Sequence, residues 1–261
     1  MKCKICAAQS AKIFNARIMN KYDIDYFLCP TCGFLQTEDP HWLKESYAKG
    51  AISSLDTGVL TRNLYFSKVT SAIIYFLCNP KESFLDYGGG HGIFTRLMRD
   101  RGFDFYWHDP YGDNIFSRGF EGQVDGARKY EALTSFENFE HFVDPMLEIE
   151  KLIGLTDTVI FSTVLLPPEI PKPEKWCYYC LGHGQHVSLY SHKTLAFIAQ
   201  KYHLNLYTHR MGYHMFSRRR LSAFQFDLII KLTTWGLSNI TRLPSRTDAD
   251  YVAMGKILQG V

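Results

Sequence analysis

A run of glycines at residues 88–92, Gly-Gly-Gly-His-Gly, constrains the fold of this chain more than any other feature of its sequence. A short apolar segment with strand character, 83–87, runs directly into it, and a segment with helical character, 93–101, follows. Glycine lets the backbone pass close to a ligand, and the N-terminus of a helix attracts negative charge. The order of strand, glycine loop and helix therefore predicts a cofactor-binding turn in an α/β fold with a parallel sheet.

Two aspartates flank the glycine loop at positions that indicate which cofactor it binds. An enzyme that binds a dinucleotide requires glycine at position 93, where this chain has Ile93. Asp86 suits the cationic amino group of a methionine moiety and would repel pyrophosphate. Asp109 follows Gly90 by 19 residues, at the end of the next strand, where a carboxylate can accept both ribose hydroxyls. The alternative is that both aspartates are turn residues and that the glycines only tighten a bend.

Strands and helices alternate along the chain after the glycine loop. The aromatic segment 103–107 and the β-branched segment 158–166 are typical of strands, and Ser191 is placed to cap a helix that runs to about residue 202. Further expected elements are helices over 61–76 and 141–155, a strand over 130–136, and a hairpin of strands over 204–208 and 213–217. This order predicts a doubly wound, parallel sheet into which the hairpin puts one antiparallel strand.

Four cysteines near the N-terminus form two C-x-x-C pairs that are typical of a metal site. Tetrahedral zinc takes four thiolates, and four cysteines leave no open coordination position, so the expected zinc is structural. A redox role and a coincidence of spacing are the alternatives. A third pair, Cys177-Tyr-Tyr-Cys180, stands alone, and we expect two thiols in an aromatic loop there, with a redox pair or a second metal site as the alternative. The predicted metal ligands are Cys3, Cys6, Cys29 and Cys32.

The motifs DYGGGHG at 86–92, HDP at 108–110 and ENFEH at 137–141 resemble those of class I S-adenosylmethionine-dependent methyltransferases. The resemblance implies a Rossmann-like α/β fold with a seven-stranded sheet that is mostly parallel and has an antiparallel last strand. It also implies S-adenosylmethionine as cofactor, with its methionine end at the first acid and the glycines and its ribose at the second acid. The residues assigned to cofactor binding in this way are Asp86, Gly88, Gly89, Gly90, Gly92, Asp109, Pro110, Phe136 and Glu137.

The two C-x-x-C pairs ahead of this core resemble a narrower group, the methyltransferases of deoxysugar and surface-polysaccharide pathways, which include nucleotide-sugar C-methyltransferases. That group carries a segment Glu-His-x-x-aromatic-aromatic-Ser whose histidine acts as base, and residues 185–191, QHVSLYS, are similar to it. Gln185 replaces the glutamate and Leu189 replaces the first aromatic residue. The additional C-terminal domain of the group has no counterpart in this sequence, and the resemblance covers about residues 1–217.

A loop of about 20 residues, between the strand ending near Leu166 and the helix at Ser191, carries the candidate catalytic groups. Loops of this length in compact domains are usually functional, and open α/β sheets bind ligands at the carboxyl ends of their strands. Imidazole can remove a proton near neutral pH, so His186 is the predicted base or substrate contact and His183 the second candidate. A packing or capping role is the alternative, and His141 is a further candidate.

The remaining features bear on organisation, compartment and partners. We expect a zinc ribbon-like module over 1–40, a linker and first helix over 41–80, the methyltransferase core over 81–220 and a C-terminal helical extension over 221–261. No apolar run is long enough to span a membrane, and seven cysteines without a secretory signal indicate a reducing, cytoplasmic compartment. A formal net charge of +3 disfavours a dedicated nucleic-acid binder. The three arginines at 218–220 precede a segment that we expect to dock on its own domain, with contact to a membrane surface or a partner as the alternative.

Taken as a sequence, the chain is therefore predicted to methylate a small-molecule acceptor, a sugar or nucleotide-linked sugar in glycan or deoxysugar biosynthesis. Two alternatives stay open: a zinc-containing RNA methyltransferase, and a non-catalytic adaptor that binds zinc and S-adenosylmethionine. The spacing of the glycines disfavours an enzyme linked to NAD. The acceptor atom, the sugar, the pathway and the oligomeric state do not follow from the sequence.

Overall fold

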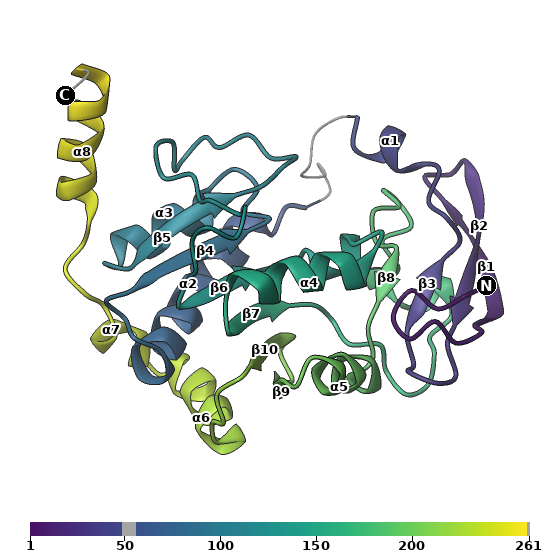
Figure 1. Cartoon of the computed structure of the whole chain (residues 1–261). Coiled ribbons are helices and arrows are strands. Elements are labelled where there is room, and N and C mark those ends of the chain that lie inside the picture. The colour runs from purple at the N-terminus through teal and green to yellow at the C-terminus, as the bar shows by residue number, and fades with distance from the viewer. Residues whose placement is uncertain (49–55, 260–261) are drawn as a thin grey trace. The chain divides into compact units, whose positions relative to one another are not determined.

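The computed structural model describes residues 1–48 and 56–259 (Figure 1). Residues 49–55, which fall within the predicted linker of 41–80, lie outside the described part. The chain divides into two compact units. Unit 1 comprises Met1–Ser53, Phe136–Ile153 and Phe161–Arg219, and unit 2 comprises Ser54–Ser135, Gly154–Ile160 and Arg220–Val261.

A mixed sheet confirms the Rossmann-like α/β class. Its strand order is β5 (Asp104–His108), β4 (Ser83–Tyr87), β6 (Ala132–Ser135), β7 (Thr158–Ser162), β10 (Tyr213–Ser217) and β9 (Asn205–His209). β4 pairs in parallel with both β5 and β6, whereas β9 and β10 form an antiparallel hairpin. The predicted hairpin is therefore present, and parallel pairing brings the carboxyl ends of β4 and β5 to the same edge.

Within the described residues this sheet has six strands, one fewer than the family resemblance implies. Between β5 and β6, Glu121 makes a single parallel bridge to Trp107, and no strand extends from it. Gly119, Gly122 and Gly126 interrupt this segment, and glycine weakens a strand because it has no side chain to pack. Gly119 and Gly126 also have φ values of 87° and 86°, far from the β region. The expectation of seven strands is thus corrected to six.

A second sheet, with the order β1-β2-β3-β8, lies entirely within unit 1. β1 (Ala11–Ile18) and β2 (Tyr22–Leu28) form an antiparallel hairpin, β3 (Leu35–Thr37) pairs with β2, and β8 (Ser188–Leu189) pairs with β3. The N-terminal strands therefore share a hydrophobic core with a much later part of the chain. The buried members of that core are Ala16, Ile18, Ile24, Tyr26, Leu35, Trp42, Leu166, Tyr179, Val187 and Leu189.

The helices that lie wholly or mostly in unit 1 are of two lengths. α1 (Leu43–Ser46), η1 (Phe139–His141), η2 (Pro173–Lys175) and η3 (Cys177–Tyr179) are single turns, whereas α4 (Pro145–Leu155) and α5 (His192–Lys201) are longer. Ser191 caps α5 as predicted, because its hydroxyl accepts a hydrogen bond from the backbone N–H of Thr194 at 3.1 Å. The hydroxyl of Thr194 accepts the N–H of Ser191 in return, at 3.2 Å, which completes a capping box.

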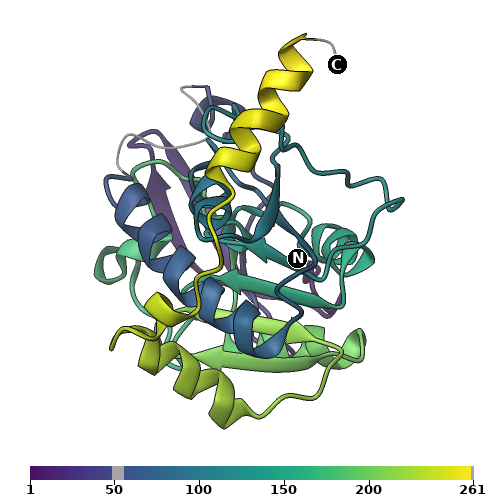
Figure 2. The same ribbon diagram turned by 90° about the vertical axis from the view of Figure 1, so that its left-hand side faces the viewer.

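Helices of unit 2 surround α2 (Val59–Leu77), which contains the helix expected over 61–76. α2 contacts α3 (Ile93–Asp100), α6 (Ala223–Thr233) and α7 (Leu237–Ile240), and Figure 2 shows α2 in blue beside α6. Its buried face includes Val69, Ala72 and Ile73, which recur at helical spacing. Among the described residues, none of the helices combines the length and the apolar character that crossing a membrane requires.

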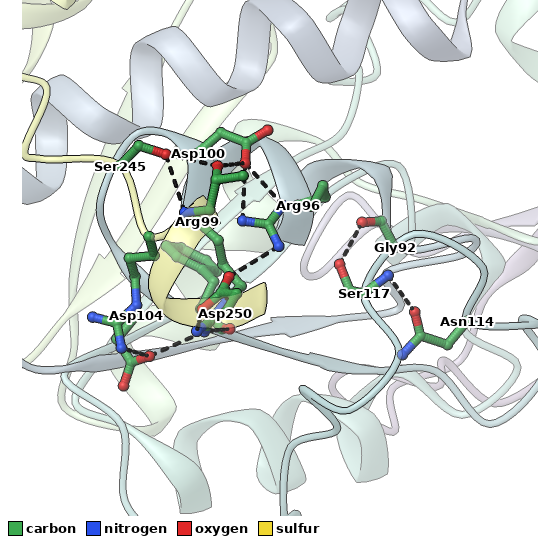
Figure 3. A network of polar contacts seen from close by, with 12 residues as sticks. Gly92, Arg96, Arg99, Asp100, Asp104, Asn114, Ser117, Ser245 and Asp250 are labelled. Carbon is green, nitrogen blue, oxygen red and sulfur yellow. Dashed lines mark hydrogen bonds and ion pairs between the residues drawn. The ribbon is translucent and has the colours of Figure 1, made fainter. Parts of the chain in front are cut away.

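The last helix, α8 (Thr247–Gln259), is anchored to α3 by buried charges at its N-terminal turn (Figure 3). The guanidinium of Arg99 donates to both carboxylate oxygens of Asp250, at 2.8 and 2.6 Å. Arg96 lies 2.9 Å from the same carboxylate, and Arg99 also pairs with Asp104 at 3.0 Å. Beyond this turn α8 is largely exposed; Leu258, for example, is 88% exposed. Charge pairing, rather than an apolar face, therefore holds the helix.

Candidate functional site

The glycine loop begins where β4 ends and is held to the end of β5. Gly88 and Gly89 both donate their N–H groups to the carbonyl of His108, at 2.8 and 3.2 Å. A Cβ at Gly89 would lie 2.6 Å from Cδ1 of Trp107 and 2.7 Å from Oδ2 of Asp86, so only glycine fits there. The loop is therefore built on the close approach of two parallel strands, as the sequence predicts.

Asp109 contacts this loop directly. Its Oδ2 accepts the N–H of Gly90 at 2.9 Å, and its Oδ1 accepts the N–H groups of Tyr111 and Gly112, each at 2.7 Å. A carboxylate offers about four acceptor sites, so three backbone donors fix its orientation and leave capacity for a ligand hydroxyl. The structure thus places the second predicted acid against the middle of the glycine loop, half-buried at the end of β5.

Asp86, the first predicted acid, lies under the loop and is 3% exposed. Its two oxygens accept hydrogen bonds from the hydroxyls of Thr95, at 3.0 Å, and Thr134, at 3.1 Å. Burial raises the pKa of Asp86 to about 7; the two threonine hydroxyls act in the opposite direction, and the charge of Asp109 raises the pKa further. A cation bound near this carboxyl group would favour its ionised form.

The segment after Asp109 folds back over the start of α3. The carbonyl of His91 accepts the N–H groups of Ile115 and Phe116, at 3.1 and 3.0 Å, and the carbonyl of Gly92 accepts the hydroxyl of Ser117 at 2.8 Å. Figure 3 shows Gly92 and Ser117 with Asn114, whose side-chain oxygen accepts the N–H of Ser117 at 2.9 Å. Ser117 thus contacts the last glycine of the loop, and Asn114 holds Ser117 in place. No sequence pattern marks them, because their role depends on a tertiary contact.

Pro110 is exposed and precedes Tyr111, whose side chain is 86% exposed. The remaining two predicted cofactor residues, Phe136 and Glu137, belong to unit 1. Glu137 has a φ of 50°, a conformation that is uncommon outside glycine and concentrates at functional sites. The Glu137 carboxylate accepts a hydrogen bond from the hydroxyl of Ser162 at 2.6 Å, and the backbone N–H of Glu137 donates to the oxygen of that hydroxyl at 2.7 Å. The Phe136 ring lies 5.3 Å from that of Tyr213.

All four predicted metal ligands of the N-terminal segment converge in unit 1. Their sulfur atoms lie within 4.8 Å of one another, with Cys3 and Cys32 at 3.5 Å and Cys6 and Cys29 at 3.4 Å. Zinc bonded to four thiolates at about 2.3 Å sets sulfur atoms about 3.8 Å apart in a tetrahedron. The hydrogen bond from the Cys32 thiol lowers the pKa of Cys3 to about 5, and the same contact raises the pKa of Cys32. This donor set could hold a zinc ion.

Each C-x-x-C pair forms the same backbone turn. In the first pair, the residue after the second cysteine, Ala7, has a φ of 60° and donates its N–H to the carbonyl of Cys3 at 2.9 Å. In the second pair, Gly33 has a φ of 72° and donates to the carbonyl of Cys29 at 2.8 Å. We call this turn a knuckle: two ligands three positions apart, followed by a residue of positive φ whose N–H bonds back to the first ligand.

The predicted histidines form a cluster in unit 1. The ring of His186 lies 4.9 Å from that of His141 and 5.5 Å from that of His183. The Nδ1 atom of His186 lies 2.7 Å from the carbonyl of Tyr178, so it bears the hydrogen and leaves the lone pair on Nε2. Burial lowers the pKa of His186 to about 4 and, with the two neighbouring imidazoles, holds that of His141 well below its usual value.

Aromatic residues and α1 fix this cluster. The Tyr47 hydroxyl lies 2.9 Å from Nδ1 of His141, and the Tyr178 hydroxyl lies 3.1 Å from that of Thr163. Trp42 donates its indole N–H to the carbonyl of Gly184 at 2.7 Å. No sequence motif marks Tyr47 or Trp42, because they precede the histidine loop by more than a hundred residues. The sequence signal for them is that two aromatic residues follow the predicted zinc module of residues 1–40.

A family model described as a methyltransferase domain matches residues 62–209, which is more than half of the chain. This region contains β4, the glycine loop, Asp109 and the histidine loop. A search of curated proteins finds no matching sequence.

Solved structures with similar folds have low sequence identity to this chain. An O-methyltransferase family protein from Burkholderia thailandensis is 13% identical with a TM-score of 0.48; the match covers 60% of this chain and 56% of that one. The plantazolicin methyltransferase BpumL is 13% identical with a TM-score of 0.45, covering 76% and 88%. The magnesium protoporphyrin IX methyltransferase of Synechocystis PCC 6803 is 13% identical with a TM-score of 0.40, covering 67% and 87%. The chain thus spans little more than half the length of the first of these.

Proposed function

Because the chain belongs to the methyltransferase domain family, we propose that it transfers a methyl group from S-adenosylmethionine to a sugar, in the form of a nucleotide-linked sugar. The observation that carries this proposal is the convergence of His141, His183 and His186 with tyrosines in one cluster. Imidazoles can take a proton from a hydroxyl or an activated carbon, and aromatic rings can enclose a sugar ring. The resemblance to sugar methyltransferases supports the same acceptor class.

The glycine loop and Asp109 are proposed to bind the cofactor. When bound, S-adenosylmethionine supplies an electrophilic methyl group on a sulfonium sulfur. Asp109 already accepts three backbone N–H groups, so its carboxylate is held in place to accept a ribose hydroxyl at its remaining acceptor site without a change of conformation. Asp86 supplies negative charge under the loop, which suits a cationic amino group. We assign Pro110, Phe136 and Glu137 to the border of the cofactor, in keeping with the motif that they belong to.

His186 is proposed as the general base. Its Nδ1–H donates to the Tyr178 carbonyl, which fixes the ring and leaves the lone pair on Nε2. His183 is proposed as a second contact to the acceptor, and His141, with Tyr47, as the neighbour that completes the polar surface. A positioned base accelerates proton removal by roughly 10²–10⁴-fold.

Cys3, Cys6, Cys29 and Cys32 are proposed to hold one structural zinc ion. The four sulfur atoms already lie within 4.8 Å, and no ligand position is left open for a substrate. Because thiolates must remain reduced to bind zinc, this proposal agrees with the cytoplasmic location expected from the use of cysteine.

The proposed acceptor and base are tested by measuring transfer of labelled methyl groups from S-adenosylmethionine to a panel of nucleotide sugars. We expect at least one nucleotide sugar to be methylated, and His186→Ala to lower turnover by roughly 10²–10⁴-fold while cofactor binding persists. His192→Ala is the matched control, because His192 is exposed at the start of α5. Methylation of RNA in place of any sugar would contradict the acceptor class, and an unchanged turnover in His186→Ala would remove His186 as base.

A further inference from the structure

The histidine loop contains a third knuckle. Cys180 and His183 are three positions apart, and the next residue, Gly184, has a φ of 65° and donates its N–H to the carbonyl of Cys180 at 2.9 Å. The same contact is 2.9 Å from Ala7 to Cys3 and 2.8 Å from Gly33 to Cys29. The segment 180–184 therefore has the same backbone turn as the two C-x-x-C pairs, but its second candidate ligand is a histidine.

A third donor completes a ligand set beside this knuckle. The candidate ligand atoms of Cys180, His183 and His186 all lie within 4.8 Å of one another. His186 is oriented by its Nδ1 contact to the Tyr178 carbonyl, which leaves Nε2 as the donor atom, a hydrogen-bonding arrangement typical of metal-bound imidazoles. One thiolate and two imidazoles suit zinc and similar borderline-soft divalent ions, and three protein ligands leave one coordination position for water.

Residues from α1 and the chain before it hold the knuckle in place. The hydroxyl of Ser46 donates to the carbonyl of His183 at 2.5 Å, and the indole of Trp42 donates to that of Gly184 at 2.7 Å. A Cβ at Gly184 would lie 2.8 Å from Ile18 and 3.1 Å from the Trp42 indole, so the turn is closely covered. The ligands are thus presented by a fixed backbone, as in the two N-terminal knuckles.

We propose that Cys180, His183 and His186 bind a zinc-type divalent cation, and that this ion inhibits methyl transfer by occupying the Nε2 lone pair of His186. The inhibitory part rests on the proposed role of His186 as base. Binding replaces the proton of the Cys180 thiol, which is released to solvent. Because only one of the three ligands is a thiolate and one position is left to water, this ion is held less tightly than that of the four-cysteine site.

The metal site is tested by the zinc content of the full-length protein after metal removal, incubation with excess Zn²⁺ and gel filtration. We expect two zinc ions per chain in the wild type, one in Cys180→Ser and two in Cys177→Ser. Cys177 is the matched control, since it is an exposed cysteine of the same loop outside the ligand set. Two ions in Cys180→Ser, or one in the wild type, would overturn the site.

Metal binding can also be measured on the wild type alone, so the result does not depend on whether Cys180→Ser folds. Zn²⁺ should slow alkylation of Cys180 by iodoacetamide on the order of tenfold, and leave Cys177 unchanged, as read by mass spectrometry of tryptic peptides. Equal alkylation of Cys180 with and without Zn²⁺ would contradict metal binding.

Inhibition is tested separately by adding Zn²⁺ to the methyl transfer reaction. Turnover should fall with Zn²⁺ in the wild type and in Cys177→Ser, whereas Cys180→Ser should keep its turnover and lose the inhibition. The same loss of turnover in all three proteins would overturn the inhibitory role. If no acceptor is methylated by any of them, the proposed function fails, and the zinc content and alkylation still decide whether the metal site exists.

Discussion

A buried carboxyl group lies directly under the glycine loop. Asp86 is surrounded by the hydroxyls of Thr95 from α3 and Thr134 from β6, with Asp109 as the nearby charged group. Burial raises its pKa from 3.8 to about 7, so the folded protein retains this proton at pH values where the unfolded chain has released it. The contribution of Asp86 to stability is therefore complete below about pH 4 and is lost as the pH rises through about 7.

Replacing Asp86 with asparagine should remove this pH dependence. Without cofactor, Asp86→Asn should be more stable than the wild type at pH 8, by up to about 4 kcal/mol, since a tenfold change in proton affinity corresponds to about 1.4 kcal/mol. At pH 4 the two proteins should unfold at similar denaturant concentrations. Urea unfolding at both pH values measures the difference. Parallel pH profiles for the two proteins would show that Asp86 is not a buried ionisable group with a raised pKa.

The contacts of a single residue can be predicted from the sequence where the pairing of neighbouring strands alone brings the two partners together. The contact of Asp109 with Gly90 follows from the parallel pairing of β4 and β5, which the sequence pattern indicates. The hydrogen bonds to Asp86 come from two threonines on separate elements, and no motif identifies them. The contact of Tyr47 with His141 likewise joins distant parts of the chain, so the histidine cluster is predicted only in part.

At the scale of elements, the second N-terminal knuckle, which lies between β2 and β3 in the chain, contacts the start of α5. Thr194 donates its hydroxyl to the carbonyl of Cys32 at 3.0 Å, and a Cβ at Gly33 would lie 2.6 Å from the hydroxyl of Ser191. A metal ion held by the four cysteines would therefore stabilise the second knuckle against the start of α5. Thiolate coordination would then be part of the folding free energy of this segment.

Cys29→Ser should abolish zinc binding at the N-terminal site and loosen residues 1–40. We expect faster amide hydrogen exchange in β1, β2 and β3 than in the wild type, with the affinity for S-adenosylhomocysteine largely retained. Cys78→Ser, which alters a cysteine outside the ligand cluster, is the control. A wild type that takes up no zinc after repletion would exclude the structural zinc, and unchanged exchange in Cys29→Ser would exclude its stabilising role.

The attachment of α8 should depend on Asp250. Burial raises the pKa of Asp250, but Arg99 and Arg96 outweigh this effect and lower it overall, as expected for an ion pair that stabilises the fold. Asp250→Ala would leave Arg99 without its bidentate partner, and losing one member of a buried pair costs about 3–5 kcal/mol. Chemical denaturation should show this loss, and hydrogen exchange should show α8 exposed. Asp248→Ala, exposed in the same turn, should behave as the wild type; equal stabilities of the two variants would refute the anchor.

The sequence best predicts the helices and strands whose apolar residues recur at a regular spacing or whose ends carry a clear capping or turn residue. The strands around the glycine loop, the helix capped by Ser191 and the final hairpin all appear in the structure. The seventh strand that the resemblance implies is missing from the described residues, where Gly119, Gly122 and Gly126 interrupt the segment between β5 and β6. The anchoring of α8 was not predicted, because the sequence shows Asp250 and Arg99 only as two separate charged residues.

On the scale of the whole molecule, the compact units are not consecutive pieces of the sequence. Residues 1–53 share unit 1 with 136–153 and 161–219, and unit 2 joins 54–135 with 154–160 and 220–261. The domain boundaries at residues 40, 80 and 220 that the sequence indicates remain predictions. Each unit contains part of the proposed machinery: the glycine loop and Asp109 lie in unit 2, and the cysteine and histidine clusters lie in unit 1.

Binding of S-adenosylmethionine by the glycine loop and Asp109 is tested by isothermal titration of the purified protein with S-adenosylhomocysteine. Asp109→Ala removes the carboxylate proposed to accept a ribose hydroxyl, which should cost about 1.5–3 kcal/mol, or roughly tenfold to hundredfold in affinity. Asp113→Ala, an exposed acid four residues on, should bind as the wild type does, and NAD should bind more weakly than S-adenosylhomocysteine. An unchanged dissociation constant in Asp109→Ala, or tighter binding of NAD, would contradict the account.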